Sequence, residues 1–220
     1  MHNTIKRSYS GVVSQVTQAV AGMERHASTI AFTLVSAEAM TSNLNLMTAG
    51  ETTTKQAKGK LRSQQLALKA AYAGARNYLF VAKDVLKVPL GKKYSSAWDE
   101  TGFLHSLKVP RKEETILVYL LTLHAYFTKH AGHQNAPMNV TAAQANTLRN
   151  ALLAARTGLN SQKTTWQSAM ANRNVHLRQA REHLRALIKE LAVRLTPQDE
   201  RWASFGLNKP GQLRTPEVPE

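Results

Sequence analysis

Residues 141–195 constrain the fold more than any other stretch, because they contain no proline and a single glycine, Gly158. Mostly apolar residues recur along this stretch at steps of four and three: Leu148, Leu152, Ala155, Leu159, Gln162, Trp166, Met170, Arg173, Leu177, Ala180, Leu184, Leu187 and Leu191. This is a heptad-like seam with one extra step of four before Met170, a stutter that locally unwinds a supercoil. A helix of this length would extend roughly 80 Å, far beyond the average globular helix of about 12 residues.

The chain before this stretch predicts a second long helix over residues 36–87, ended by Pro89 and Gly91. Its centre is weak, because Gly50 and Gly59 each disfavour a helix by about 1 kcal/mol relative to alanine. Three threonines at 52–54 lower the helix propensity further. We expect one helix, and the sequence leaves open whether it is continuous through both glycines.

Two shorter helices are predicted, each before a long one. The first covers residues 9–27, and a break at 28–35 follows it. The other begins after Pro110, ends at His130 or Ala131, and has Gly132 as its stop signal. Thr141 then fits the N-cap of the last long helix, with Gln144 as its capping-box partner.

The two halves of the chain resemble each other at non-periodic landmarks. The matching strings, at an offset of 104 or 105 residues, are Arg25-His26-Ala27 with Lys129-His130-Ala131, Val35-Ser36-Ala37 with Val140-Thr141-Ala142, and Trp98-x3-Gly102 with Trp202-x3-Gly206. Chance identity between alanine- and leucine-rich helices is the alternative explanation. We interpret the matches as a tandem duplication, with repeat one at 9–104 and repeat two at 112–207.

The duplication predicts an all-α fold, an elongated antiparallel four-helix bundle in which each repeat supplies one short and one long helix. Residues 1–207 would form a single helical domain. Residues 208–220 contain three prolines and a glycine, so they predict an extended tail or a linker.

Several short strings carry a family resemblance: Leu90-Gly91, Trp98, Gly102-Phe103, Val109-Pro110, Arg201-Trp202, Phe205-Gly206-Leu207-Asn208-Lys209-Pro210-Gly211 and Thr215-Pro216-Glu217-Val218-Pro219-Glu220. In these strings the chain resembles a group of bacterial helical proteins with no established activity. The resemblance implies the same helical order over most of the chain. It also implies that the tail is similar to a junction that sometimes leads into a β-sandwich module. It brings no site residues.

Charge is the strongest indication of function. The chain has 29 Lys and Arg against 14 Asp and Glu, which gives a net charge of +15. The alternatives are a solvated basic surface and an anionic partner, such as an acidic protein, nucleic acid or acidic lipid. We expect no transmembrane helix and no signal peptide, and therefore a cytoplasmic protein.

The sequence contains few of the residue patterns that an active site or a metal site requires. The absence of cysteine excludes disulfides, thiolate metal sites and cysteine nucleophiles. The chain lacks a P-loop, a Gly-x-Ser-x-Gly elbow and a His-Glu-x-x-His motif, so we expect no enzymatic activity, no metal and no cofactor. His26 and His130 occupy matching helix ends, where a histidine interacts favourably with free carbonyls. Trp98 and Trp202 could stack on a ligand, but we expect them to be buried against the long helices.

The basic residues form the candidate site. The first set follows one stripe of the last long helix and comprises Arg178, Arg181, Arg185 and Lys189. The second set lies at the centre of the other long helix and comprises Lys55, Lys58, Lys60 and Arg62. We therefore expect a non-enzymatic structural or interaction module that presents long basic helices to an acidic protein or an anionic polymer. The alternative is sequence-independent nucleic-acid binding through the first set.

Overall fold

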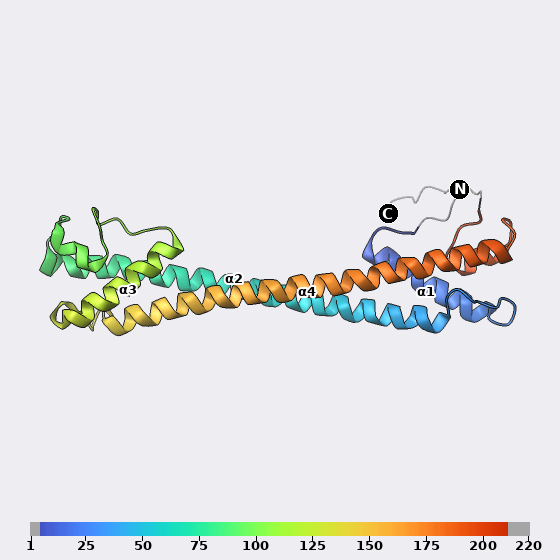
Figure 1. Cartoon of the computed structure of the whole chain (residues 1–220), viewed down its shortest axis with the longest axis horizontal. Helices are drawn as coiled ribbons and strands as arrows, with labels where there is room; N and C mark the ends of the chain where they lie inside the picture. Colours follow the sequence, from blue (N-terminus) through green and yellow to red (C-terminus); the bar gives the residue numbers. More distant parts are fainter. Residues whose placement is uncertain (1–4, 211–220) are drawn as a thin grey trace. The chain divides into compact units, whose positions relative to one another are not determined.

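The computed structural model describes residues 5–210, and this part of the chain is all-α, with no strand among the described residues. The elements in order are α1 (Tyr9–His26), α2 (Ala37–Leu90), the 3-10 turn η1 (Ser96–Thr101), α3 (Glu113–Lys129), the 3-10 turn η2 (Ala131–His133), α4 (Ala142–Arg194) and α5 (Arg201–Ser204) (Figure 1). The predicted all-α class is confirmed, and the short and long helices lie in the predicted order. Most of the predicted tail, residues 211–220, lies outside the described residues.

The thirteen predicted seam positions of α4 are all buried or half-buried, so the periodicity identified the inner face of this helix. The N-terminus of α4 also follows the prediction, because the Gln144 backbone N–H donates to the Thr141 hydroxyl at 3.1 Å. Ser8 caps α1 in the same way, accepting from the Gly11 backbone N–H at 3.1 Å.

The long helix α2 is continuous through Gly50 and Gly59, which answers the question that the sequence left open. Its threonines satisfy themselves locally: the hydroxyls of Thr52 and Thr53 donate to carbonyls four residues earlier at 3.1 and 3.0 Å. The Thr54 hydroxyl also lies 3.2 Å from the Ala169 carbonyl of α4. The Thr54 hydroxyl therefore links the low-propensity centre of α2 to α4, whereas the hydroxyls of Thr52 and Thr53 bond only within their own helix.

Two predicted helix ends need correction. Pro89 does not end α2 but lies inside its last turn, where its missing N–H removes one bond and only Leu90 follows. The helix stops at Gly91, which has a left-handed φ of +90° and donates its N–H to the Lys87 carbonyl at 3.1 Å. α3 ends at Lys129, and the predicted stop Gly132 lies in the separate turn η2.

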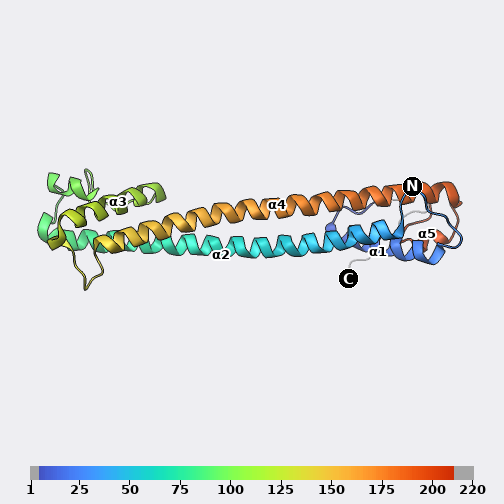
Figure 2. The same cartoon turned by 60° about the horizontal axis from the view of Figure 1, so that its bottom comes forward.

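The chain forms two compact units. Unit 1 comprises residues 1–57 and 166–220, and unit 2 comprises residues 58–165. In each unit a segment of α2 lies beside a segment of α4 in both views (Figures 1 and 2). The single-domain assignment of residues 1–207 stays a prediction.

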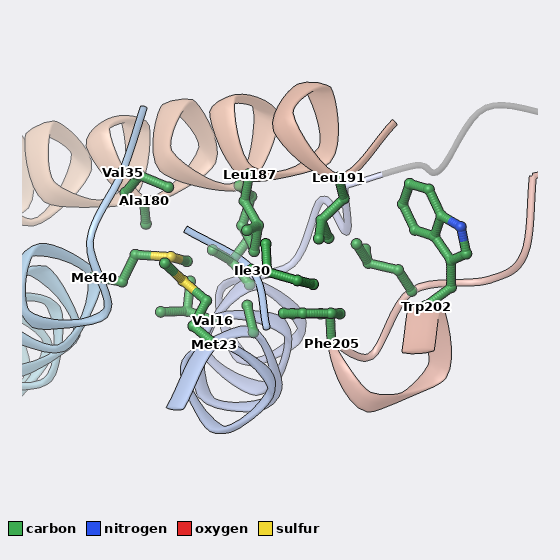
Figure 3. Packing of buried hydrophobic residues seen from close by; sticks show 14 of the residues in the cluster. Val16, Met23, Ile30, Val35, Met40, Ala180, Leu187, Leu191, Trp202 and Phe205 are labelled. Atoms are coloured by element: carbon green, nitrogen blue, oxygen red, sulfur yellow. The ribbon is translucent and has the colours of Figure 1, made fainter. Parts of the chain in front are cut away.

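Unit 1 packs α1, the first part of α2 and the last part of α4 around one core (Figure 3). Its buried members include Val12, Val16, Ala19, Met23, Ile30, Val35, Met40, Met47, Ala180, Leu184, Leu187, Leu191, Trp202 and Phe205. The tail around α5 comes so close to α1 that a Cβ on Gly22 would lie 2.6 Å from the Phe205 ring and 2.7 Å from the Ser204 carbonyl oxygen. This approach of two backbones explains a glycine in the middle of α1.

Glu190 fastens the α1–α2 loop to α4 within unit 1. Its side chain is 3 % exposed and accepts the backbone N–H groups of Thr33 and Leu34 at 2.6 and 3.1 Å. The Thr33 hydroxyl donates to the same carboxylate at 2.9 Å, and Arg194 donates at 3.2 Å. A buried carboxylate with this many donors is well compensated for its loss of water.

Unit 2 packs the last part of α2, α3 and the first part of α4 around a second core. The buried members include Ala75, Leu79, Ala82, Leu86, Trp98, Phe103, Ile116, Leu120, Leu123, Phe127, Val140, Ala145 and Leu152. Both predicted structural tryptophans are therefore core residues, with Trp98 0 % and Trp202 1 % exposed. Gly102 and Gly206 follow them in left-handed turns, with φ of +90° and +67°.

Candidate functional site

The first predicted basic set lies on α4 in unit 1. Arg178, Arg185 and Lys189 are exposed and form no ion pair among the described residues. Arg181 is half-buried and donates to the backbone carbonyl of Arg7 at 2.7 Å, so it anchors the segment before α1 rather than facing solvent freely. We call the three exposed residues, together with Arg181, the α4 stripe.

The second predicted set is divided between the two units and between two faces of α2. Lys55 belongs to unit 1 and pairs with Glu51 at 3.5 Å, whereas Lys58, Lys60 and Arg62 belong to unit 2. Lys60 is two residues from Lys58, which places it about 200° around the helix from that residue. Of this set, Lys58 and Arg62 therefore share a face, and Lys60 points away from them.

Unit 2 carries most of the excess charge. Residues 58–165 contain 16 Lys and Arg against five Asp and Glu, which accounts for 11 of the 15 net positive charges. Between Glu51 and Asp84 the sequence of α2 has no acidic residue, and none occurs between Glu114 and Glu182. The long-helix segments of unit 2 therefore present cations with almost no intervening carboxylates.

A row of cations follows α2 within unit 2, and we call it the basic row. Its members are Lys58, Arg62, Lys69, Arg76, Lys83 and Lys87, at steps of four, seven, seven, seven and four. Seven residues are nearly two helical turns and change direction by only about 20°. The basic row therefore stays on one face of α2. Charge density alone missed it, but the seven-residue spacing of Arg62, Lys69, Arg76 and Lys83 was readable in the sequence.

The carboxylates of unit 2 are already engaged elsewhere. Glu113 and Glu114 both face Arg156, at 3.8 and 3.3 Å, and Asp84 binds Lys87 at 2.7 Å. The hydrogen bond from Lys87 lowers the pKa of the Asp84 carboxyl. No member of the basic row except Lys87 forms an ion pair with any described residue. The charges of Lys58, Arg62, Lys69, Arg76 and Lys83 are therefore available to a partner.

The Glu100 carboxylate contacts His130, one of the two histidines that the sequence places at matching helix ends. Its carboxylate accepts from Lys129 at 3.0 Å and from the His130 Nε2 at 3.2 Å, and the Lys129 hydrogen bond, followed by that of His130, lowers its pKa. The His130 ring stacks on His133 at 5.5 Å between centroids. The residues from 5 to 210 hold no group of three or more His, Cys, Asp or Glu suited to a metal ion.

An exposed aromatic ring interrupts the basic row. Phe80 is 39 % exposed, and both the Arg76 guanidinium and the Lys83 ammonium lie over its ring, at 5.2 and 5.3 Å from the centroid. The Tyr72 hydroxyl donates to the Arg111 carbonyl at 2.6 Å, which brings the chain before α3 beside this part of α2. Arg111 is itself exposed and adds another cation to this side of the unit.

Other polar contacts provide less. His26 in α1 lies 2.9 Å from the Ser204 hydroxyl, but that hydroxyl donates to the Arg201 carbonyl at 2.7 Å, so it serves the turn. A shallow groove of about 540 Å³ in unit 1 is lined by residues that include Tyr9, Ser10 and Glu51. Glu51 there is paired with Arg173 at 3.1 Å.

Among the described residues, no helix combines the length and hydropathy that crossing a membrane requires.

Comparison with known proteins gives no assignment: no family model, no curated protein and no solved structure matches the chain.

Proposed function

We propose that the protein is a non-enzymatic interaction module that presents basic helices to an anionic partner. The observation that carries this proposal is the basic row of α2, in which every cation except Lys87 lacks an ion pair with a described residue and Asp84 is the one acidic residue of the segment. Such a line raises the local concentration of a polyanion or an acidic protein and speeds its association. The two units differ in charge, and unit 2 is the better candidate.

The test is retention on heparin, compared between two variants with the same change in charge. Lys58→Gln/Arg62→Gln/Lys69→Gln removes three exposed cations of the basic row. We expect elution at clearly lower salt, because each lost ionic contact weakens the salt dependence of binding. A variant that elutes with the unchanged protein would refute the basic row as the binding surface.

The matched control is Arg178→Gln/Arg185→Gln/Lys189→Gln on the α4 stripe. We expect it to elute close to the unchanged protein. Equal losses in both variants would mean that net charge alone governs retention, which contradicts a localised site.

Sequence-independent nucleic-acid binding through the α4 stripe is the second candidate, favoured by the three exposed cations there that form no ion pair with any described residue. In this case the α4 variant, rather than the α2 variant, would lose binding to duplex DNA. The slope of log affinity against log salt would fall by about 0.9 for each phosphate contact removed. No retention on duplex DNA at about 50 mM salt would exclude this candidate.

We also infer that a tandem duplication produced the fold, as a bundle of two short and two long helices. The support is positional: buried residues of one core match buried residues of the other at the predicted offsets. At 104 the pairs are Val12/Ile116, Val16/Leu120, Ala19/Leu123, Met23/Phe127, Trp98/Trp202 and Phe103/Leu207; at 105 they are Val35/Val140, Met40/Ala145, Met47/Leu152, Ala75/Ala180, Leu79/Leu184, Ala82/Leu187 and Leu86/Leu191.

Each unit draws on both proposed repeats. Unit 1 takes α1 and the start of α2 from repeat one, and the end of α4 and the Trp202 tail from repeat two. A single repeat therefore lacks half of either core. Residues 5–111 produced alone should associate into a dimer, which sedimentation velocity would detect. A stable helical monomer would contradict the duplication.

A further inference from the structure

The outward side of α2 in unit 2 carries a second heptad pattern. The residues Ser63, Leu66, Ala70, Ala73, Asn77 and Phe80 alternate steps of three and four, and all six are exposed. We call this set the outer face of α2. Leu66 is 68 % exposed, whereas Ala75, nine residues later and about half a turn around the helix, is fully buried in the core of unit 2.

The basic row borders the outer face at the positions that flank a coiled-coil seam. If Ser63, Ala70 and Asn77 are the a positions of a heptad, then Leu66, Ala73 and Phe80 are the d positions. The residues immediately before the a positions are g positions: Arg62, Lys69 and Arg76, and Lys83 continues the series before Asp84. In coiled coils the g and e positions form the interhelical ion pairs that select a partner.

The side chains of the outer face suit a close helix. Ser63, Ala70 and Ala73 are small enough for a second backbone to approach, and Leu66 provides an exposed apolar knob. Asn77 is a polar residue at one a position, the type that fixes the register of paired helices. A polyanion bound through charge alone would leave Leu66 unused, at 68 % exposure.

Charge decides the identity of the occupant. A second copy of this chain would bring a unit with the same 16 Lys and Arg and only five Asp and Glu, so the two like-charged units would repel each other. A helix with Glu or Asp at its flanking positions would pair with Arg62, Lys69, Arg76 and Lys83, none of which forms an ion pair with a described residue. We infer that the outer face of α2 docks an acidic amphipathic helix of a partner protein, in coiled-coil register. The inference rests on the proposed function and names its partner class.

The test uses a synthetic peptide of four heptads with Leu and Ala at a and d and Glu at e and g. Its affinity for the full chain is measured by fluorescence anisotropy. We expect Leu66→Ser/Phe80→Ser to weaken peptide binding by at least tenfold and to leave heparin retention unchanged, since both substitutions keep every charge. Val175→Ser/Val193→Ser, which alters two exposed apolar residues of α4, is the matched control and should bind the peptide normally.

Each outcome decides between the two claims. Unchanged peptide affinity in Leu66→Ser/Phe80→Ser, or no peptide binding by a chain that still binds heparin, overturns the helix-docking inference alone. If the unchanged protein binds neither heparin nor the peptide, the proposed function is overturned as well. Binding to phosphatidylserine-rich vesicles that depends on Leu66 and Phe80, without peptide binding, assigns the face to lipid and also overturns the inference.

A second variant guards against a folding defect. Arg62→Glu/Lys69→Glu alters only exposed side chains and should abolish binding of the Glu peptide while allowing a peptide with Lys at e and g to bind. This reversal of preference cannot arise from unfolding. Failure of the reversal would contradict pairing at the g positions.

Discussion

Replacement of Glu190 tests whether the hydrogen bonds to its carboxylate stabilise unit 1. Its carboxylate receives two backbone N–H groups, one hydroxyl and one guanidinium. A hydrogen bond to a charged group contributes about 1.5–3 kcal/mol, but Thr33 and Leu34 are exposed, so water replaces part of the loss. We expect Glu190→Ala to reduce the free energy of unfolding by about 2–4 kcal/mol, and Glu190→Gln by about 1–2 kcal/mol because one acceptor oxygen remains.

The dependence on pH provides an independent check. Burial raises the pKa of the Glu190 carboxyl, but the hydrogen bonds from Thr33 and Leu34 outweigh it, so the pKa lies below its ordinary value of 4.5. A lowered pKa in the folded state stabilises the protein above pH 4.5, and this contribution is lost as the pH falls through the folded-state pKa. The difference in stability between the unchanged protein and Glu190→Gln should therefore shrink as the pH falls below 4.5.

The assay is thermal unfolding followed by circular dichroism at pH 7 and in acid. For a chain of this size, 1 kcal/mol corresponds to about 2–4 °C, so Glu190→Ala should melt about 4–16 °C lower at pH 7. Glu182→Gln, an exposed carboxylate on the same helix, is the control and should melt unchanged. The reasoning is refuted if Glu190→Ala melts within about 1 °C of the unchanged protein, since the assigned hydrogen bonds would then contribute nothing measurable.

Two pairs of substitutions test the tails and the centre of α2 by the same melting assay. Gly206→Ala should destabilise the fold by about 1–3 kcal/mol, because it imposes a left-handed φ of +67° on alanine and places a Cβ against the side chain of Gln18 in α1. Gly59→Ala, in an open helical position, should instead stabilise it by about 0.4–1 kcal/mol, and equal effects would contradict the geometry. Trp202→Phe should cost about 1 kcal/mol more than Trp98→Phe. The indole N–H of Trp202 donates to a carbonyl at 3.0 Å, whereas that of Trp98 has no hydrogen-bond partner among the described residues, so the reverse order would refute this comparison.

Local signals in the sequence predicted the helices well. The apolar period located the inner face of α4, and the caps and stop signals placed most helix ends within a few residues. Pro89 misled because its effect depends on how many helical residues follow it, and here only Leu90 does. α2 continues through its glycines because packing against α4, which includes the bond from the Thr54 hydroxyl to the Ala169 carbonyl, compensates for their weak propensity.

The candidate site was predicted only in part. Charge density drew attention to Lys58 and Arg62, which lie in the proposed basic row, but it grouped them with Lys60, which the helical turn directs elsewhere. Contacts such as Glu100 with His130 join residues 30 positions apart, and no local pattern predicts them. Which cations are free was also unreadable, because it depends on where the few carboxylates of unit 2 find partners in the fold.

The division of the chain into units has a consequence for its synthesis. Unit 2 is one continuous stretch, residues 58–165, whereas unit 1 needs segments from both sides of it. In the core of unit 1, Val12 and Val16 of α1 pack with Leu187 and Leu191 near the end of α4. Closing such distant contacts is slow, and domains fold as units while the chain emerges from its N-terminus. We therefore expect unit 2 to fold first, on the ribosome. The apolar face of α1 would stay exposed, and accessible to a chaperone, until the end of α4 has been translated.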